Sequence, residues 1–506
     1  MALAALCAIL FLTFLDNTIV SVALANVQTS LNSSVTGLQW IVDGYMLAFA
    51  ALMLTGGTLG DLLGRKKVML IGVAIFCAGS IVAAVAPDTS TLIAGRSVMG
   101  LGAAASEPGT LSLIRHISPE REERAVALGV WAAVSGLALA LGPVLGGVLA
   151  DGLGWRSIFW FGVAFAAISF AVAAVTLTES RDPVGRKLDL PGLATGATAI
   201  MAATFAVIEG ENRGYGTWWI VALFATSAVL IVAFVVVEHR VPDPVLKLEF
   251  VRNPTFAAAN VVAFAVNLSV FSVFFFTALY LQLITSFSGY QIALVFTSLA
   301  VAMIVSGPLA GRWTAKVGPK VPMVIGCALA GLGLFLLDWK LTATTTVAAL
   351  WWPLAIAGLG FGIALVTMTA AVLAIVPAEQ SGMAASTVNT SRELGGVFGV
   401  AVLGAVVNAQ LTTGLSEKLV KLGVPLQFRQ IVVHVVTTGG STNPSDYGIA
   451  KGHLTLVARV LLAAEGAAGH GVHLALRIAG GIVLAAAVVA AFAARHRVAR
   501  VGELEL

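Results

Sequence analysis

The chain has 506 residues, of which 58% are hydrophobic and 11% are charged, and its formal net charge is +4. Because soluble domains carry about 25% charged residues, this composition excludes a soluble globular protein. The basic residues are too few and too scattered for a nucleic-acid-binding surface, and they instead report which side of a membrane each loop faces.

Fourteen apolar runs follow one another along the chain, and most have about the 20 residues or more that a transmembrane helix needs. They cover residues 1–24, 38–59, 68–86, 91–113, 125–149, 157–177, 190–208, 218–238, 255–284, 291–311, 321–338, 347–376, 386–407 and 474–494. The sequence therefore predicts an all-α polytopic membrane protein with fourteen transmembrane helices.

The first run also resembles a secretory signal peptide, because it ends in the small-residue sequence Ala23-Leu24-Ala25. No Lys or Arg precedes the run, however, and Asp16 interrupts it. We therefore expect the segment to remain as the first transmembrane helix.

Basic residues gather in alternate loops, which fixes the expected orientation of the helices. One set of loops carries Arg65, Lys66, Lys67, Arg115, Arg121, Arg124, Arg181, Arg186, Lys187, Arg240, Lys247, Arg252, Arg312, Lys316, Lys320, Arg392, Arg495, Arg497 and Arg500. The opposite short loops carry only Arg156, Arg213 and Lys340. Since basic loops stay in the cytoplasm, both ends of the chain are predicted to be cytoplasmic.

The sequence also predicts two related halves. Residues 57–66 align with residues 311–320 through their glycines and final lysine, and internal repeats of this kind are typical of secondary transporters. We therefore expect six-helix halves at residues 1–178 and 255–494, with two inserted helices between them at residues 190–238. A long outer loop is expected at residues 408–473, with a turn at 439–444 and an interfacial helix near 454–462.

Three ionisable residues lie inside predicted spans towards their outer ends: Asp16, Asp43 and Arg96. A charged side chain in the middle of a membrane costs about 2.5–3.5 kcal/mol, so such residues usually line an ion or substrate path. From the helical rise, Asp43 and Arg96 lie about 8 Å below the outer surface, and Asp16 lies about 12–16 Å below it. These depths allow one acid–base cluster for proton coupling. The alternatives are a permanently paired Asp16 and a hydrated, interfacial Asp43.

Glu107 follows Arg96 by eleven residues, which is close to three helical turns. Arg96, Gly100, Ala103 and Glu107 therefore share one face of their helix, and the small residues between the charges allow close helix packing or leave room for a ligand. Glu107 is a candidate for the wall of a substrate cavity. The alternative is that it caps a kink at Pro108.

Asn260 and Asn267 share a face of the ninth predicted helix, beside several phenylalanines. They are further candidates for the cavity wall, although hydrogen bonding between helices explains them slightly better.

The remaining motifs predict no nucleotide site, metal site or disulfide. Gly358, Gly360 and Gly362 follow no strand, and no P-loop lysine motif is present, so we expect no nucleotide and no ATP-driven step. His470 and His473 have a spacing used by metal ligands, but no further ligands cluster with them, and they are expected in the outer loop. The three cysteines lie in apolar runs and predict no disulfide. We expect no metal, no cofactor and no enzymatic activity.

Four segments resemble motifs of the 14-span drug:proton antiporter branch of the major facilitator superfamily. They are residues 15–24 in helix 1, 57–67 between helices 2 and 3, 96–102 in helix 4 and 142–147 in helix 5. The resemblance departs from the usual pattern at Ser21, Ala25 and Leu62. It implies the major-facilitator fold, a location in the bacterial inner membrane and a monomeric protein.

The resemblance also implies roles for particular residues. Asp16 and Arg96 are expected to couple transport to protons. A cytoplasmic gating motif is expected at Gly57, Asp61, Gly64, Arg65 and Lys66. The motif typical of antiporters is expected at Gly142, Pro143, Gly146 and Gly147. Asp61 and Arg65 are also four residues apart, a spacing that favours an ion pair at a helix end.

Together these features predict a secondary transporter that exports small, partly apolar compounds in exchange for protons. An exporter of one metabolite or antibiotic, an importer of the same fold, and a membrane sensor without transport remain as alternatives. The partners expected are the small-molecule substrate, protons and the lipid bilayer.

Overall fold

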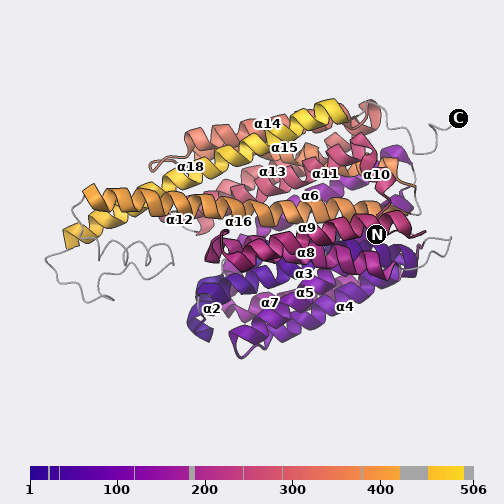
Figure 1. Cartoon of the computed structure of the whole chain (residues 1–506), viewed down its shortest axis with the longest axis horizontal. Coiled ribbons are helices and arrows are strands. Elements are labelled where there is room, and N and C mark those ends of the chain that lie inside the picture. The colour runs from indigo at the N-terminus through magenta and orange to yellow at the C-terminus, as the bar shows by residue number, and fades with distance from the viewer. Residues whose placement is uncertain are drawn as a thin grey trace.

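The computed structural model describes residues 1–20, 23–33, 35–118, 120–181, 189–242, 244, 246–285, 287, 289–377, 380–421 and 454–494. These residues form helices and connecting turns, with no strand among them. Figure 1 shows that the long helices run side by side in one bundle. The prediction of an all-α polytopic protein is confirmed.

Every predicted apolar run corresponds to a helical segment. The region predicted as the N-terminal half, residues 1–178, contains α1 (Ala2–Ile19), α3 (Val35–Leu63), α4 (Arg65–Ala84), α5 (Thr89–Ile117), α6 (Arg121–Leu153) and α7 (Arg156–Thr176). The helices predicted as an inserted pair are α8 (Leu190–Arg213) and α9 (Trp218–Arg240). The region predicted as the C-terminal half, residues 255–494, contains α11 (Pro254–Ser272), α13 (Gly289–Val317), α14 (Lys320–Lys340), α15 (Val347–Ile375), α16 (Ser381–Lys421) and α18 (Leu454–Ala493). We keep the names N-terminal half, inserted helices and C-terminal half for these three predicted groups. Shorter elements are α2 (Leu24–Leu31), α10 (Leu248–Arg252), the π-helical turn η2 (Val273–Thr277) and α12 (Ala278–Leu283), and the last two continue α11.

Thirteen helical segments within the described residues are long and apolar enough to cross a membrane. The predicted span outside this set is α5, which carries the charged residues Arg96 and Glu107. With 29 residues it is about 44 Å long, more than the hydrocarbon core of about 30 Å. Because α5 packs along both α3 and α4, its polar side chains are covered by other helices.

The small residues of α5 serve close helix packing. A Cβ atom on Gly100 would lie 2.4 Å from the backbone oxygen of Tyr45 on α3, and one on Gly102 would lie 2.4 Å from the backbone nitrogen of Phe76 on α4. Both distances are shorter than any real contact. The first of the two alternatives for this face, close packing of backbones, is therefore the one that the structure supports.

The two aligned segments of the predicted repeat each have a glycine with a positive φ at a tight turn. Gly64, between α3 and α4, has φ +113°, and Gly318, between α13 and α14, has φ +85°. Non-glycine residues rarely adopt such angles. The matching glycines support a structural relationship between the two helix pairs.

The inserted helices lie at the seam between the halves, where α8 contacts both α3 and α16. Trp40 on α3 donates a hydrogen bond from Nε1 to Oε1 of Glu209 on α8, at 3.1 Å. The hydroxyl of Tyr215, just after α8, donates to the backbone oxygen of Ala401 on α16 at 3.4 Å. Figure 1 shows α8 beside α3, and α9 packs on α8.

Parts of the outer loop expected at 408–473 are helical. α16 continues to Lys421 and α18 begins at Leu454, so both helices extend well beyond the predicted spans. Leu415 and Leu419, one turn apart, are fully buried, which gives α16 an apolar face that favours continued helix. The turn expected at 439–444 lies outside the described residues, and the helix expected at 454–462 is the first part of α18.

Candidate functional site

A buried ion pair joins α1 to α5. The Nη1 atom of Arg96 both pairs with and donates a hydrogen bond to Oδ2 of Asp16, and the two residues are only 1% and 6% exposed. Arg96 Nε also donates to the backbone oxygen of Ile41 on α3 at 3.0 Å. The guanidinium carbon lies 4.5 Å from the centre of the Tyr45 ring, and the Tyr45 hydroxyl donates to the backbone oxygen of Thr13 at 3.2 Å. Three helices of the N-terminal half therefore meet at this pair.

Such a pair is a weak source of stability. The loss of hydration offsets most of the attraction, so replacing a buried ion pair by apolar side chains is often neutral, whereas removing one partner costs about 3–5 kcal/mol. An ionisable pair inside a membrane span is more readily explained by function.

Asp43 lies away from this pair, on the opposite face of α3. Ile41 and Tyr45, whose atoms contact Arg96, are one turn apart and fully buried. Asp43 is two residues from each, about 200° around the helix, and it is half-buried. The structure thus brings together Asp16 and Arg96 but not Asp43, because estimates of depth say nothing about the rotation of a helix.

A second buried charged cluster connects the two halves, and the sequence reasoning missed most of it. Glu107 Oε1 on α5 lies 3.8 Å from Arg392 Nη1 on α16, and Glu393 follows on the same helix. All three residues are buried, with exposures of 0%, 1% and 4%. Arg392 was expected in a cytoplasmic loop, which is wrong. Its position within the predicted span at 386–407 was the signal that could have placed it inside the bundle.

Aromatic rings surround the guanidinium of Arg392. Its central carbon lies 5.0 Å from the ring centres of both Phe14 on α1 and Trp131 on α6, close enough for cation–π attraction. Its Nη1 atom donates to Oδ1 of Asn389 at 3.1 Å. This side chain of the C-terminal half therefore reaches in among three helices of the N-terminal half.

The two asparagines of α11 make hydrogen bonds within the C-terminal half. Asn260 Nδ2 donates to the backbone oxygen of Phe256 at 2.9 Å, and its Oδ1 accepts from the hydroxyl of Ser391 on α16 at 3.0 Å. Asn267 Nδ2 donates to the backbone oxygen of Ala263 at 3.2 Å. The Asn260–Ser391 bond joins two helices, as the sequence slightly favoured, whereas the bond of Asn267 lies within α11 itself.

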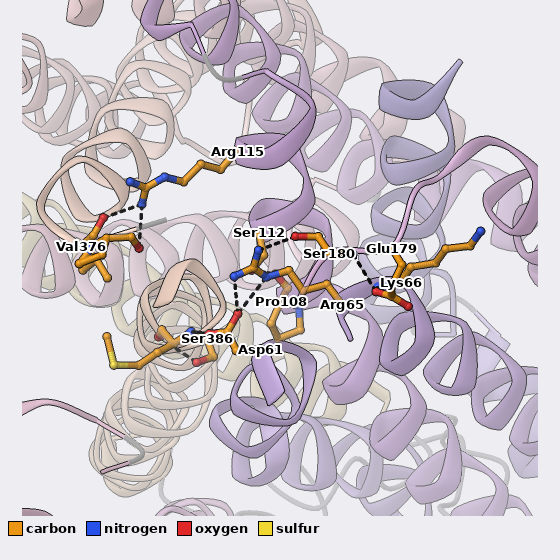
Figure 2. Close-up of polar contacts among 12 residues, drawn as sticks. Asp61, Arg65, Lys66, Pro108, Ser112, Arg115, Glu179, Ser180, Val376 and Ser386 are labelled. Atoms are coloured by element: carbon orange, nitrogen blue, oxygen red, sulfur yellow. Dashed lines mark hydrogen bonds and ion pairs between the residues drawn. The ribbon is translucent and has the colours of Figure 1, made fainter. Parts of the chain in front are cut away.

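The residues predicted to form a gating motif make a polar network where α3 ends and α4 begins, which we call the Asp61 end of the bundle. Arg65 Nη2 lies 2.8 Å from Asp61 Oδ1, and Arg65 Nη1 donates to the Ser180 hydroxyl at 2.9 Å (Figure 2). Lys66 Nζ donates to the backbone oxygens of Ala174 and Leu177, both at 2.7 Å. The network joins α3 and α4 to the last turn of α7 and to the segment that follows it.

Two contacts at the Asp61 end join the halves directly. Asp61 Oδ2 accepts a hydrogen bond from the backbone nitrogen of Met383, in the first turn of α16, at 2.9 Å. A helix N-terminus favours an anion, because its first N–H groups are free and the helix dipole is positive there. Arg115, near the end of α5, donates to the backbone oxygen of Val376 at 2.6 Å (Figure 2). The halves are therefore held together at this end.

The glycine motif on α6 brings that helix against α1 beside Asp16. A Cβ atom on Gly142 would lie 1.8 Å from the Thr18 hydroxyl oxygen and 3.0 Å from the backbone nitrogen of Ile19, whereas one on Gly147 would meet nothing within 4 Å. The Thr18 hydroxyl donates across the same contact to the backbone oxygen of Leu139, at 3.1 Å. Pro143 and Gly146 lie within the same helix.

Gly142→Ala is expected to destabilise the protein by about 1–3 kcal/mol, the usual cost of forcing an extra methyl group into a packed contact. Gly147→Ala is the matched control and should be neutral. Thermal unfolding of the purified variants checks both. Equal melting temperatures for the two variants would show that α1 and α6 are not in close contact.

The two histidines lie on α18 and not in a loop. His473 Nδ1 lies 2.6 Å from Asp338 Oδ1 on α14, and Arg477 Nε lies 2.8 Å from Asp338 Oδ2. Within the part of the chain that the structure describes, no three His, Cys, Asp or Glu residues come together as metal ligands.

Comparisons with known proteins agree with this architecture. The family model of the Major Facilitator Superfamily matches residues 6–400. The chain is 33% identical over 436 residues to the Multidrug resistance protein Stp of Mycobacterium tuberculosis, an alignment covering 86% of this chain and 80% of Stp. It is 33% identical over 401 residues to the Methylenomycin A resistance protein of Streptomyces coelicolor, covering 78% of this chain and 83% of that protein. In structure it resembles the human organic anion transporter MFSD10 (TETRAN), with a TM-score of 0.60 and 14% sequence identity, over 97% of this chain and 100% of that one; this likeness concerns the fold alone.

Proposed function

Since the chain belongs to the Major Facilitator Superfamily, we propose that this multi-pass membrane transporter exports drug-like, partly apolar compounds in exchange for protons. The observation that carries the proposal is the buried Asp16–Arg96 ion pair, which is an acid and a base covered by three helices of one half. The relatives named for multidrug and antibiotic resistance support drug-like compounds as the substrate class.

The pair suits proton coupling because protonation changes what holds the helices together. A proton on Asp16 removes the charge that attracts Arg96, and Arg96 then keeps its contacts with Ile41 and Tyr45 of α3. The relative positions of α1 and α5 are thereby linked to the proton. A membrane potential adds about 2.3 kcal/mol per charge for each 100 mV.

The Asp61 end is proposed as the cytoplasmic gate of an alternating-access cycle. The contacts Asp61–Met383 and Arg115–Val376 close the two halves there, and the cycle breaks them when the halves rock apart at this end. The expected orientation, with both termini in the cytoplasm of a bacterial inner membrane, places this gate on the inner side. Asn260 and Asn267 remain proposed neighbours of the substrate path, and the protein is proposed to act as a monomer.

A test of the function uses a pump-deficient bacterial host with and without this chain, challenged with a panel of cationic and neutral toxic compounds. Tolerance to several chemically different compounds is expected. In everted membrane vesicles energised to acidify their interior, each exported compound should raise the internal pH, as read by a pH-sensitive dye. Equal tolerance of the two strains together with no pH response would contradict the proposal.

The panel also separates the nearest alternative. Tolerance to a single compound, with a pH response to that compound alone, would identify an exporter of one antibiotic or metabolite. The similarity to the Methylenomycin A resistance protein, named for a single antibiotic, is the observation that keeps this alternative open.

A further inference from the structure

We propose that Glu107, Arg392 and Glu393 form a second proton-binding site, shared by the two halves and separate from Asp16 and Arg96. The inference deepens the proposed function, but its test is read without any transport. It rests on the number of charges buried together, on the hydrogen bonds that Glu107 and Arg392 lack, and on the helices that carry the three residues.

The charges of the cluster do not balance. Two carboxyl groups face one guanidinium, and none of the three residues is more than 4% exposed. A buried charge without a partner costs several kcal/mol, and such a group usually becomes neutral instead. Arg392 can offset one carboxylate, so the balanced state of the cluster holds one proton between Glu107 and Glu393.

Among the described residues, Arg392 is the one positive charge that acts on Glu107 and Glu393. α1 contributes the Phe14 ring and α6 contributes the Trp131 ring. From α3 the Tyr45 hydroxyl lies within electrostatic reach of both glutamates and also of Asp16 and Arg96. Arg96 is paired with Asp16, so it balances that acid rather than these.

The hydrogen bonds of the cluster are also incomplete. Within the described residues, both carboxyl oxygens of Glu107 are buried without a hydrogen-bond partner, as are Nε of Arg392 and Nδ2 of Asn389. The 3.8 Å separation of Glu107 and Arg392 is that of an ion pair without a hydrogen bond. An ionised carboxylate normally accepts several hydrogen bonds when buried, so the site as built fits a carboxyl group that exchanges a proton.

The location of the three residues links this proton to the movement of the halves. Glu107 belongs to α5 in the N-terminal half, whereas Arg392 and Glu393 are neighbours on α16 in the C-terminal half. When the halves separate, Arg392 moves away from Glu107 and stays with Glu393. Each conformation therefore pairs Arg392 with a different carboxylate, which leaves the other one to hold the proton.

Infrared spectroscopy of the purified full-length protein tests the site through the carbonyl stretch of protonated carboxylic acids. Above about pH 6 exposed carboxyl groups are ionised and do not contribute. The Asp16→Asn variant should still show a protonated carboxyl band there. Adding Glu393→Gln should remove that band, because Glu107 and Arg392 then form a balanced pair. Glu179→Gln, at an exposed carboxyl group, is the matched control and should leave the band in place.

Two results would overturn the site. One is the absence of any such band once Asp16 is replaced. The other is a band that survives replacement of Glu393 and, in a separate variant, of Glu107. Glu107→Gln also leaves one acid and one base, so it provides a second balanced cluster if the first variant is poorly folded. Transport assays of Asp16→Asn, which test the proposed function, do not enter this measurement.

Discussion

Asp16→Asn is expected to abolish the export of a drug-like compound against its gradient, reducing proton-driven accumulation in everted vesicles to the level of vesicles without the protein. The amide cannot take up or release a proton, so the step that we assign to Asp16 no longer exists. Exchange of labelled for unlabelled compound across the membrane, which needs no proton, should continue.

Two comparisons make this result specific. Asp88→Asn makes the same chemical change at the exposed N-cap of α5, the helix that carries Arg96, and asparagine is an equally good cap, so export should be unaffected. Asp16→Glu keeps an ionisable group and should retain proton-driven export at a lower rate. Because Asp16→Asn leaves Arg96 buried without its partner, we expect a loss of about 3–5 kcal/mol in stability, which thermal unfolding would detect. Uphill export by Asp16→Asn at the wild-type rate would refute the role of this carboxyl group.

Asp61→Asn is expected to open the bundle at the Asp61 end. The substitution removes the charge that pairs with Arg65 and that the first turn of α16 stabilises through Met383. A hydrogen bond to a charged group contributes about 1.5–3 kcal/mol, and a change of about 1.4 kcal/mol shifts an equilibrium tenfold. The population of the state that is closed at this end should therefore fall by about tenfold to a hundredfold relative to the open state.

Spin labels at Leu63 and Val317, which are exposed residues at this end of opposite halves, would report the change as a longer inter-label distance. Glu179→Gln is the matched control. Glu179 accepts hydrogen bonds from the backbone nitrogens of Lys66 and Lys67 within the N-terminal half, so its loss should not separate the halves. An unchanged distance distribution in Asp61→Asn would mean that other contacts close this end.

The fold could be predicted from the sequence to a large extent, because lipid imposes simple rules. Each crossing needs a long apolar helix, and each of the predicted runs corresponds to one. Hydropathy predicts a transmembrane helix less well where charged residues interrupt the apolar run. The predicted span within α5 carries two charged residues, Arg96 and Glu107, which lower its hydropathy. α16 and α18 continue into a region expected to be a loop because the two helices pack on each other there, with Gly414 against Ala467.

The candidate site could be predicted only in part. Asp16, Arg96 and Glu107 were found because a charge in an apolar run is conspicuous, and motifs added Asp61 and Arg65. The partners of these residues on other helices of the bundle could not be predicted. Nothing in the sequence relates residue 107 to residue 392, and the positive-inside rule favours placing an isolated arginine near a helix end in a loop. The same limit applied to Asp43, since helix rotation is decided by tertiary packing.

The position of α8 between α3 and α16 makes the two sides of the transporter unequal for compounds dissolved in the bilayer. On that side, a lateral entrance between the halves would require α8 to be displaced together with the helices that it covers. On the other side, α6 packs directly on α13, with Gly129 and Gly307 in mutual backbone contact, whereas α8 packs on α3 and α16. A lipophilic compound approaching from the membrane therefore meets one flank covered by α8 and one flank formed by the direct contact of α6 and α13.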